Sequence, residues 1–350
     1  MKQGWGIKKI KDICDKASSN IAQNKITELN GDYPVFGASG FVQNVDFYHR
    51  DTDYIGVVKD GSGVGRVNVY PAYSSLLGTL QYILPKEGYA LNYVAYALKS
   101  LNLAEYASGA AIPHIYFKDY GEETIPVPPR EEQERIVEEL DCLSGVIERK
   151  REQLKELDAL AQSIFYQMFG DPITNEKGWE VNKLGEVASE IFAGGDKPKD
   201  FSDIQTDEYL YPIYANGEGD RGLLGYSKTY RVESKAVALG ARGASIGNCR
   251  ICEGKFTPVV RLITIIPSNK IDIIYLFYSV RTMSFNISGA GQAQLTTPNV
   301  INKSITIPPL SLQQEFAEKI EAIEKQKELI KKSISETETL FHARMDYYFN

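Results

Sequence analysis

The stretch that decides the fold occurs twice in the chain. Ile125-Pro-Val-Pro-Pro-Arg-Glu-Glu-Gln-Glu134 is matched by Ile305-Thr-Ile-Pro-Pro-Leu-Ser-Leu-Gln-Gln314. Proline and acidic residues are favoured where a helix begins. In the second copy, Ser311 with Gln314 three residues later fits a capping box. Each Pro-Pro pair is therefore predicted to start a helix.

Behind each pair, apolar residues recur at the 3–4 spacing of one helix face over about five heptads. Lys150 interrupts the first stripe, and Lys327, Thr337 and Arg344 interrupt the second. The stripes consist of Ile136, Leu140, Leu143, Ile147, Leu154, Leu157, Ala161, Ile164 and Met168, and of Phe316, Ile320, Ile323, Ile330, Ile334, Phe341 and Tyr348. A helix of about 40 residues spans roughly 60 Å, so one small globule cannot cover its stripe. Each helix therefore needs a partner helix.

The similarity extends along the whole chain. The segment from Trp5 to Cys14 resembles that from Trp179 to Ala188, and Ile55–Gly65 resembles Val237–Gly247. The offset between matching residues starts at 174, rises to 182 and settles at 180. A steady offset indicates duplication of a whole domain with its tail, with copies near residues 1–170 and 171–350, and the period is far longer than that of solenoid repeats.

The part of each copy before the Pro-Pro pair is rich in β-branched, aromatic and turn residues, which predicts a mixed, β-rich α+β globule. The clearest strand-like runs are Tyr54–Val58, Leu80–Leu84, Lys235–Leu239 and Val259–Ile266. One helix is expected in each globule, near Asn92–Leu101 and near Asp272–Met283.

The two long helices are natural partners for each other. Two repeats related by a two-fold axis would place them antiparallel, as a coiled coil with pseudo-two-fold symmetry and a globule at each end. Alternatively, each helix folds back on its own globule or pairs with another protein. Two similar globules held apart by a rigid helical spacer could each contact one of two DNA half-sites at a fixed separation. Because the globules differ in sequence, the half-sites should differ too.

Composition limits the class of protein. The chain has 350 residues, 43% of them hydrophobic, and a net charge of −7, which argues against DNA binding through bulk positive charge. It contains no apolar run long enough to span a membrane and no secretory signal at the start. Four cysteines do not make a disulfide framework, so a reducing cytoplasm is the expected compartment.

The centre of the chain resembles a known family. Ser163-Ile-Phe-Tyr-Gln-Met-Phe-Gly-Asp-Pro172, then Gly178-Trp-Glu-Val181 and Lys183-Leu-Gly-Glu-Val187, is similar to the central conserved region of the DNA-specificity subunits of type I restriction-modification systems. The two Pro-Pro blocks resemble that family as well, and the resemblance covers the whole chain. The second block has Leu312 where the first has Glu132, so one acidic contact is expected to be missing there.

This resemblance implies four segments: a target-recognition domain at 1–128, a central conserved helix at 129–170, a second target-recognition domain at 171–309 and a distal conserved helix at 310–350. It implies a subunit that reads a bipartite, asymmetric double-stranded DNA target and holds two adenine-modification (methyltransferase) subunits, joined by restriction subunits that translocate DNA. Exposed acids near the start of the first helix are candidates for docking the modification subunits, although an ordinary solvated face explains most of them. No cofactor is expected on this chain; S-adenosylmethionine, ATP and Mg²⁺ belong to the partner subunits.

The residues agree that this chain is not an enzyme. Neither Pro-Pro pair has the Asn or Asp before it and the aromatic residue after it that an adenine methyltransferase needs. Gly61–Gly65 lacks the Lys-Ser/Thr of a phosphate-binding loop and is better explained as a tight turn. Cys249 and Cys252 have zinc-knuckle spacing, but the other two cysteines lie singly and far away. No metal or catalytic site is predicted.

Three pairs of glycine-containing polar loops are the candidates for DNA contact, because Arg, Lys, Asn, Gln, Ser and Thr read base edges. They are Gly37–Asn44 with Asn216–Arg221, Lys59–Arg66 with Arg242–Asn248, and Ser108–His114 with Ser288–Thr297. The candidate base-reading residues are Lys59, Arg66, His114, Arg221, Arg242, Gln292, Gln294 and Thr296. The candidate phosphate contacts are Lys118, Lys228 and Lys303. For each residue the alternative is an ordinary exposed turn.

The charge is unevenly divided. The helical segments 129–170 and 310–350 carry −6 of the net charge, the short linker 171–178 carries −1, and the globules 1–128 and 179–309 sum to zero. The free chain should therefore bind DNA weakly, since neutral globules neutralise few phosphates. A different class of function, a non-catalytic coiled-coil scaffold for protein partners, stays open on the sequence alone.

Overall fold

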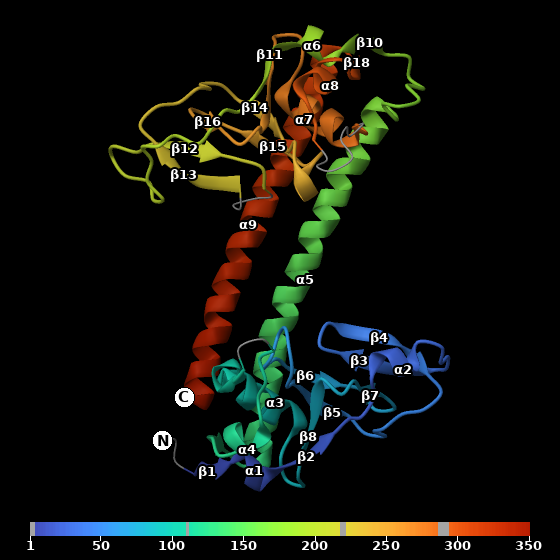
Figure 1. The fold of residues 1–350 in the computed structure, drawn as a ribbon, viewed down its shortest axis with the longest axis vertical. Coiled ribbons are helices and arrows are strands. Elements are labelled where there is room, and N and C mark those ends of the chain that lie inside the picture. The colour runs from blue at the N-terminus through green and yellow to red at the C-terminus, as the bar shows by residue number, and fades with distance from the viewer. Residues whose placement is uncertain (1–3, 110–111, 218–221, 286–293) are drawn as a thin grey trace. The chain divides into compact units, whose positions relative to one another are not determined.

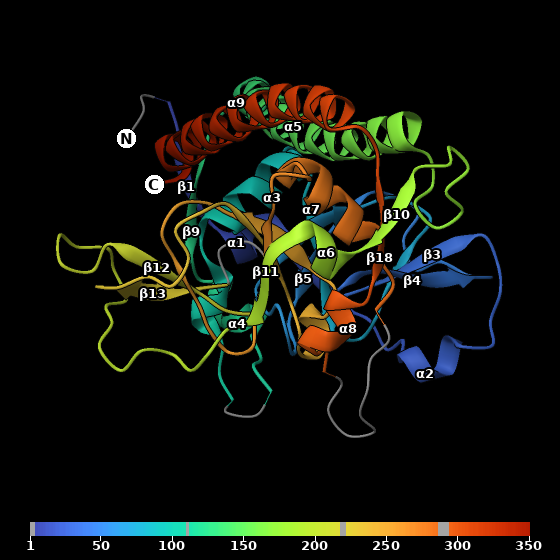
Figure 2. The same ribbon diagram turned by 90° about the horizontal axis from the view of Figure 1, so that it is seen from above.

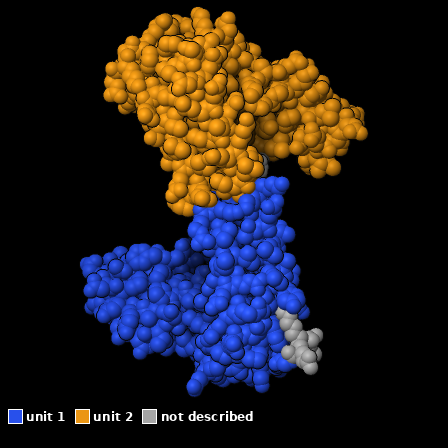
Figure 3. All heavy atoms as spheres, turned by 180° about the vertical axis from the view of Figure 1, so that it is seen from behind, with its two compact units in different colours: residues 1–151, 331–350 blue, residues 152–330 orange. Residues whose placement is uncertain are grey.

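The computed structural model describes residues 4–109, 112–217, 222–285 and 294–350 (Figure 1). The chain forms two compact units, which are coloured separately in Figure 3. Unit 1 contains Met1–Arg151 together with Lys331–Asn350, and unit 2 contains Glu152–Ile330. Within the described residues, no helix is both long enough and apolar enough to cross a membrane.

Unit 1 contains three described sheets. Strand β1 (Gly6–Lys9) pairs antiparallel with β9 (Thr124–Val127), immediately before the first Pro-Pro pair. A four-stranded antiparallel sheet has the order β2 (Cys14–Ser18), β8 (Leu80–Pro85), β5 (Tyr54–Val58), β6 (Val67–Tyr70). A smaller sheet has the order β4 (Gly40–Val45), β3 (Tyr33–Gly37), β7 (Ser75–Leu76), with β3 and β7 parallel.

Unit 2 repeats this topology strand for strand. Strand β10 (Glu180–Lys183) pairs with β18 (Ser304–Ile307). The four-stranded sheet has the order β11 (Ala188–Ala193), β17 (Ile263–Pro267), β14 (Ala236–Leu239), β15 (Cys249–Cys252). The small sheet has the order β13 (Leu223–Ser227), β12 (Tyr211–Tyr214), β16 (Thr257–Pro258), with β12 and β16 parallel. The predicted duplication of a β-rich α+β domain is confirmed.

Unit 1 has α1 (Ile10–Ile13), α2 (Gln23–Ile26), α3 (Leu91–Ser100), a 3-10 turn (Leu103–Tyr106) and α4 (Phe117–Tyr120). Unit 2 has α6 (Leu184–Val187), a 3-10 turn (Gly243–Ser245), α7 (Ile273–Thr282) and α8 (Thr297–Ile301). Three short helices of unit 1, α1, α3 and α4, have counterparts in unit 2, which are α6, α7 and α8, whereas α2 and the 3-10 turns do not correspond. Helices α3 and α7 lie within one residue of their predicted positions.

One predicted strand begins later than expected. The run Val259–Ile266 was expected to be extended throughout, but β17 starts only at Ile263. Val260 and Arg261 adopt φ of 53° and 62°, a left-handed conformation that a β-branched residue rarely takes. The backbone therefore turns before the strand can begin, which periodicity alone does not reveal.

The two long helices, α5 (Arg130–Phe169) and α9 (Leu310–Phe349), pair antiparallel inside each unit. In unit 1 the Glu139 carboxylate accepts hydrogen bonds from Tyr348 Oη and Arg344 Nε, each at 2.6 Å. In unit 2 the Lys327 ammonium lies 2.7 Å from the Asp158 carboxylate. The predicted antiparallel pairing of the two helices with each other is confirmed.

The predicted capping box does not form. Helix α9 already begins at Leu310, so Ser311 lies inside its first turn. The backbone N–H of Gln313 donates to the carbonyl of Pro309 at 3.2 Å. The N-cap position therefore falls on Pro309, two residues earlier than the Ser311–Gln314 pattern indicated.

Each long helix has a second apolar face at its carboxyl end. Phe165 and Phe169 of α5 are buried in the core of unit 2, and Met345 and Phe349 of α9 are buried in the core of unit 1. The core of unit 1 also includes Ile136 and Leu140 from the start of α5. The core of unit 2 also includes Phe316, Ile320 and Ile323 from the start of α9. Each globule is thus closed by the beginning of its own helix and the end of the other.

A buried glutamine ties each long helix to its globule. Gln133 Oε1 accepts from the N–H of Ala90 at 2.8 Å, and its Nε2 donates to the carbonyl of Pro128 at 3.0 Å. Gln313 Oε1 accepts from the N–H of Asp272 at 2.8 Å, and its Nε2 donates to Pro308 at 2.8 Å. The glutamine four residues after the second proline of each pair therefore fixes the start of the long helix against its globule.

Candidate nucleic-acid interface

In unit 1 a glycine turn follows strand β5 and returns the chain to β6. Val58 and Arg66 close the turn, because Val58 N–H donates to the Arg66 carbonyl at 2.9 Å and Gly65 N–H donates to the Val58 carbonyl at 2.8 Å. Gly61, Gly63 and Gly65 have φ between 80° and 86°, a region that other residues rarely adopt. The structure thus confirms a tight turn here.

The loop before helix α4 folds onto this turn. Ile115 N–H donates to the Lys59 carbonyl at 2.9 Å, and Gly61 N–H donates to the Pro113 carbonyl at 2.9 Å. The Ile115 side chain is buried and anchors the loop. Asp60 and His114 then face each other across an antiparallel bridge. Helix α4, which follows, lies on the side of unit 1 away from α5 and α9 (Figure 2).

Three predicted contact residues of unit 1 come together at this bridge. His114 Nδ1 donates to Asp60 Oδ1, and the Lys59 ammonium lies 2.9 Å from Asp60 Oδ2. The His114 ring meets the Tyr116 ring edge-on with centroids 4.1 Å apart, and Lys118 Nζ lies 5.2 Å from the Tyr116 centroid. The side chains of Lys59, Asp60 and His114 are each about a quarter exposed. The sequence reasoning missed Asp60 and Tyr116.

Unit 2 builds the same frame from equivalent residues. Gly240 N–H donates to the Asn248 carbonyl at 2.8 Å, and Gly247 N–H donates to the Gly240 carbonyl at 3.1 Å. Leu295 N–H donates to the Ala241 carbonyl at 2.9 Å, and the Leu295 side chain is buried. Arg242 and Gln294 face each other across the bridge that matches Asp60 and His114. Helix α8, which follows Gln294, also lies away from the long helices (Figure 2).

The remaining predicted residues have different surroundings. Arg66 folds over the glycine turn and donates to the carbonyls of Gly63 and Ser62, each at 3.2 Å. Thr296 precedes α8 and donates to the Asn299 side chain. Arg221 and Gln292 lie outside the described residues.

Two of the predicted phosphate contacts are engaged within the protein. Lys228 lies 2.5 Å from Glu208 and 3.3 Å from Asp200, and its hydrogen bond with Glu208, followed by those with Tyr209 and Asp200, raises the pKa of its ammonium above the usual range. Lys303 Nζ donates to the carbonyl of Ser284. A phosphate at either lysine would compete with these partners, so both assignments stay predictions.

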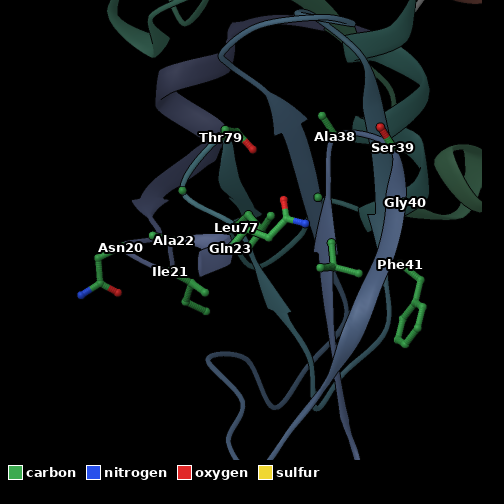
Figure 4. Close-up of a pocket in the computed structure, with 13 residues that line it drawn as sticks. Asn20, Ile21, Ala22, Gln23, Ala38, Ser39, Gly40, Phe41, Leu77 and Thr79 are labelled. Atoms are coloured by element: carbon green, nitrogen blue, oxygen red, sulfur yellow. The ribbon is translucent and has the colours of Figure 1, made fainter. Parts of the chain in front are cut away.

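A cleft of about 790 Å³ borders the glycine turn of unit 1. Figure 4 shows Asn20 and Ile21 on one side of it and Phe41 of the β3–β4 hairpin on the other. Thr79 joins the cleft to the turn, since its carbonyl accepts from Lys59 N–H at 3.0 Å. The predicted contact loop Gly37–Asn44 thus adjoins the predicted loop Lys59–Arg66.

Among the described residues, no group of three or more His, Cys, Asp or Glu side chains could hold a metal ion. Burial raises the pKa of the Cys249 thiol to about 12 and also raises that of Cys252. Both Pro-Pro pairs lie directly at the starts of α5 and α9.

Comparison with known proteins decides the family. The family model described as the type I restriction modification DNA specificity domain matches residues 2–159 and again residues 176–339. The chain belongs to this family. It carries two type I DNA specificity domains in tandem, one for each copy of the repeat.

Relatives of the type I DNA specificity chain match over most of its length. A protein of Mycoplasma pneumoniae named as a type I specificity subunit is 30% identical over 328 residues, which cover 88% of this chain and 86% of the relative. The MjaIX specificity subunit of a type I restriction enzyme from Methanocaldococcus jannaschii is 24% identical, with coverage of 89% and 85%.

A solved structure shares the fold of this specificity chain. The S subunit of a type I restriction-modification system from M. genitalium matches with a TM-score of 0.66 at 17% identity, covering 99% of this chain and 96% of that one. The fold class predicted from the sequence, two β-rich domains each followed by a long helix, is therefore confirmed.

Proposed function

We propose that this chain reads a bipartite, asymmetric double-stranded DNA target for a type I restriction-modification complex, one half-site for each unit. The observation that carries the proposal is the duplicated fold, with a DNA specificity domain matched in both copies. The glycine turns and adjoining loops supply the polar side chains for contact. Helices α5 and α9 supply the spacer that sets the gap between half-sites.

In this proposal the chain does no chemistry. It holds two modification subunits, which methylate adenine with S-adenosylmethionine, and the restriction subunits, which use ATP and Mg²⁺. The buried glutamines Gln133 and Gln313 fix the helix starts. The exposed acids Glu131, Glu134 and Glu138 are left on the surface there as candidate docking contacts.

The test is to express the chain with its modification partner in a host lacking other methyltransferases and to map methylated adenines across the genome. We expect one split motif with two different half-sites and a fixed gap. A complex that assembles but modifies no defined motif would contradict the proposal and would favour a scaffold for protein partners. Methyl transfer by this chain alone would contradict its non-catalytic role.

A further inference from the structure

The glycine turns of the two units share their backbone hydrogen bonds and differ in their polar side chains. Four backbone hydrogen bonds of the turn in unit 1 recur in unit 2 between residues numbered 182 higher. One of them joins Val58 to Arg66 in unit 1 and Gly240 to Asn248 in unit 2. A second joins Val64 to Gly61 at 3.1 Å and recurs between Ile246 and Gly243 at 3.3 Å. The two copies of the turn therefore share individual backbone hydrogen bonds.

The residues that dock the second loop onto this frame are apolar in both units. Ile115 and Leu295, which dock the second loop onto the turn, are each 1% exposed. Their N–H groups donate to equivalent carbonyls, those of Lys59 and Ala241, at the same distance of 2.9 Å. Packing therefore fixes the positions of neighbouring side chains without depending on what those side chains are.

Three positions on the frame carry polar side chains that differ completely between the units. The bridge pairs Asp60 with His114 in unit 1 and Arg242 with Gln294 in unit 2. The closing position of the turn holds Arg66 in unit 1 and Asn248 in unit 2. Residues directly opposite each other in an antiparallel pair have neighbouring side chains, so each bridge presents its two side chains together.

The chemistry of these pairs matches base edges. Arginine suits guanine, asparagine and glutamine suit adenine, and a carboxylate accepts from the amine of cytosine. Asp60 already accepts from Lys59 and His114, and an ionised carboxylate has about four lone-pair sites, so it can accept a further donor. Its charge is offset by Lys59, which reduces its repulsion of DNA phosphates.

We propose that these three equivalent positions, Asp60, Arg66 and His114 in unit 1 and Arg242, Asn248 and Gln294 in unit 2, are specificity determinants that make the two half-sites different. Unit 1 reads a C·G pair through Asp60, and unit 2 reads guanine through Arg242 and adenine through Gln294. The inference rests on the proposed function, because it assumes that the two units read DNA.

The experiment exchanges the side chains and leaves the frame. The triple variant Asp60→Arg, Arg66→Asn, His114→Gln is assembled with its modification partner and used to select duplexes from a library. That library is randomised in half-site 1 and fixed in half-site 2. We expect the preferred base at one or more positions of half-site 1 to change, with discrimination shifting by roughly 5- to 150-fold, the range of one good bidentate contact. Half-site 2 should be selected unchanged when it is randomised instead.

Glu87→Gln is the matched control, because Glu87 is exposed on unit 1 away from the frame and its loss also changes the net charge by +1. It should select the wild-type bases. The reverse exchange, Arg242→Asp, Asn248→Arg, Gln294→His, should alter only half-site 2. If a triple variant does not assemble, His114→Gln alone should change the preference at a single position.

The outcomes separate this inference from the function on which it rests. If the wild-type complex selects a split motif and the exchanged variants select the same bases as wild type, the three positions are not determinants and the inference is wrong. If the wild-type complex itself selects no split motif, the proposed function fails first.

Discussion

At the residue scale, burial explains why a glutamine follows each Pro-Pro pair. Gln133 and Gln313 are almost fully buried, and each makes one accepted and at least one donated hydrogen bond to backbone groups at a helix start. A buried amide left without partners costs about 1–3 kcal/mol. These glutamines are therefore required by the backbone groups around them.

Gln313→Leu should lower the stability of unit 2. The change leaves the Asp272 N–H and the Pro308 carbonyl without their partners, so we expect a loss of about 1–3 kcal/mol and a lower urea midpoint by circular dichroism. The neighbouring Gln314 is exposed, and Gln314→Leu should change stability by less than about 0.5 kcal/mol. Equal effects of both substitutions would contradict the structural role.

The four thiols should differ sharply in reactivity. Burial raises the pKa of Cys14 and of Cys249 to about 12 and raises that of Cys252, while Cys142 lies exposed on α5. Because the thiolate is the nucleophile, the native chain at pH 8 should show one fast thiol toward an aromatic disulfide reagent. Cys142→Ser should remove that fast phase, and a second fast thiol in the native chain would show that the burial is incorrect.

At the scale of elements, α5 and α9 serve two surfaces at once. The heptad stripe faces the partner helix, and the extra aromatic face near each carboxyl end enters a globule core. In unit 2, the rings of Phe165 and Phe316 lie 5.7 Å apart and those of Phe169 and Tyr275 lie 4.7 Å apart. The heptad pattern does not reveal this second face, because its residues lie beside the apolar stripe and outside the heptad positions.

Phe165→Ala should destabilise unit 2 far more than its neighbour Tyr166→Ala. Phe165 is fully buried, whereas Tyr166 is 43% exposed. Truncating a buried phenylalanine costs about 3–5 kcal/mol, so the thermal midpoint should fall clearly for Phe165→Ala and little for Tyr166→Ala. Thermal unfolding followed by circular dichroism measures both, and similar midpoints would show that α5 does not close the core.

At the scale of the whole molecule, the acidic charge belongs mainly to the helices. The helical segments hold −6 of the net charge of −7, the linker 171–178 holds −1, and the globules sum to zero. Several globule lysines are also paired with acids, among them Lys228 with Glu208, Lys235 with Glu253 and Lys255 with Glu233. The globules therefore carry no net positive charge with which to neutralise phosphates.

The chain alone should bind duplex DNA weakly and with a shallow salt dependence. Non-specific binding has dissociation constants of roughly 10⁻⁴–10⁻⁶ M at physiological salt, and the slope against salt follows the number of neutralised phosphates. Titration by fluorescence anisotropy between 50 and 200 mM salt, about the range over which such slopes are resolved, gives both quantities. Nanomolar binding with a steep slope by the chain alone would contradict the expectation, whereas the complex with its modification partner should bind tightly.

The sequence predicted the repeat, the strands Tyr54–Val58 and Leu80–Leu84 and the long helices, because periodicity and Pro-Pro starts are local signals. It missed the turn at Val260 and Arg261, whose N–H groups donate to the distant carbonyls of Gly195 and Gly194 in an unusual backbone conformation. It also missed Asp60 as a member of the candidate site, because Asp was not among the base-reading residue types considered and only the bridge places it beside Lys59 and His114. Such juxtapositions depend on residues far apart in the chain.

In both units the end of a long helix contacts the tryptophan that precedes the first strand of the globule. Trp179 donates from its indole nitrogen to the carbonyl of Phe169 at the end of α5, and Trp5 stacks against Tyr348 at the end of α9. In unit 2 the chain joins the end of α5 to β10, and in unit 1 the end of α9 lies beside Trp5, which precedes β1. A circular permutant with a flexible joint between residues 350 and 4 and new ends in the exposed turn near Ile173 should keep both units, with an unchanged melting midpoint and normal assembly.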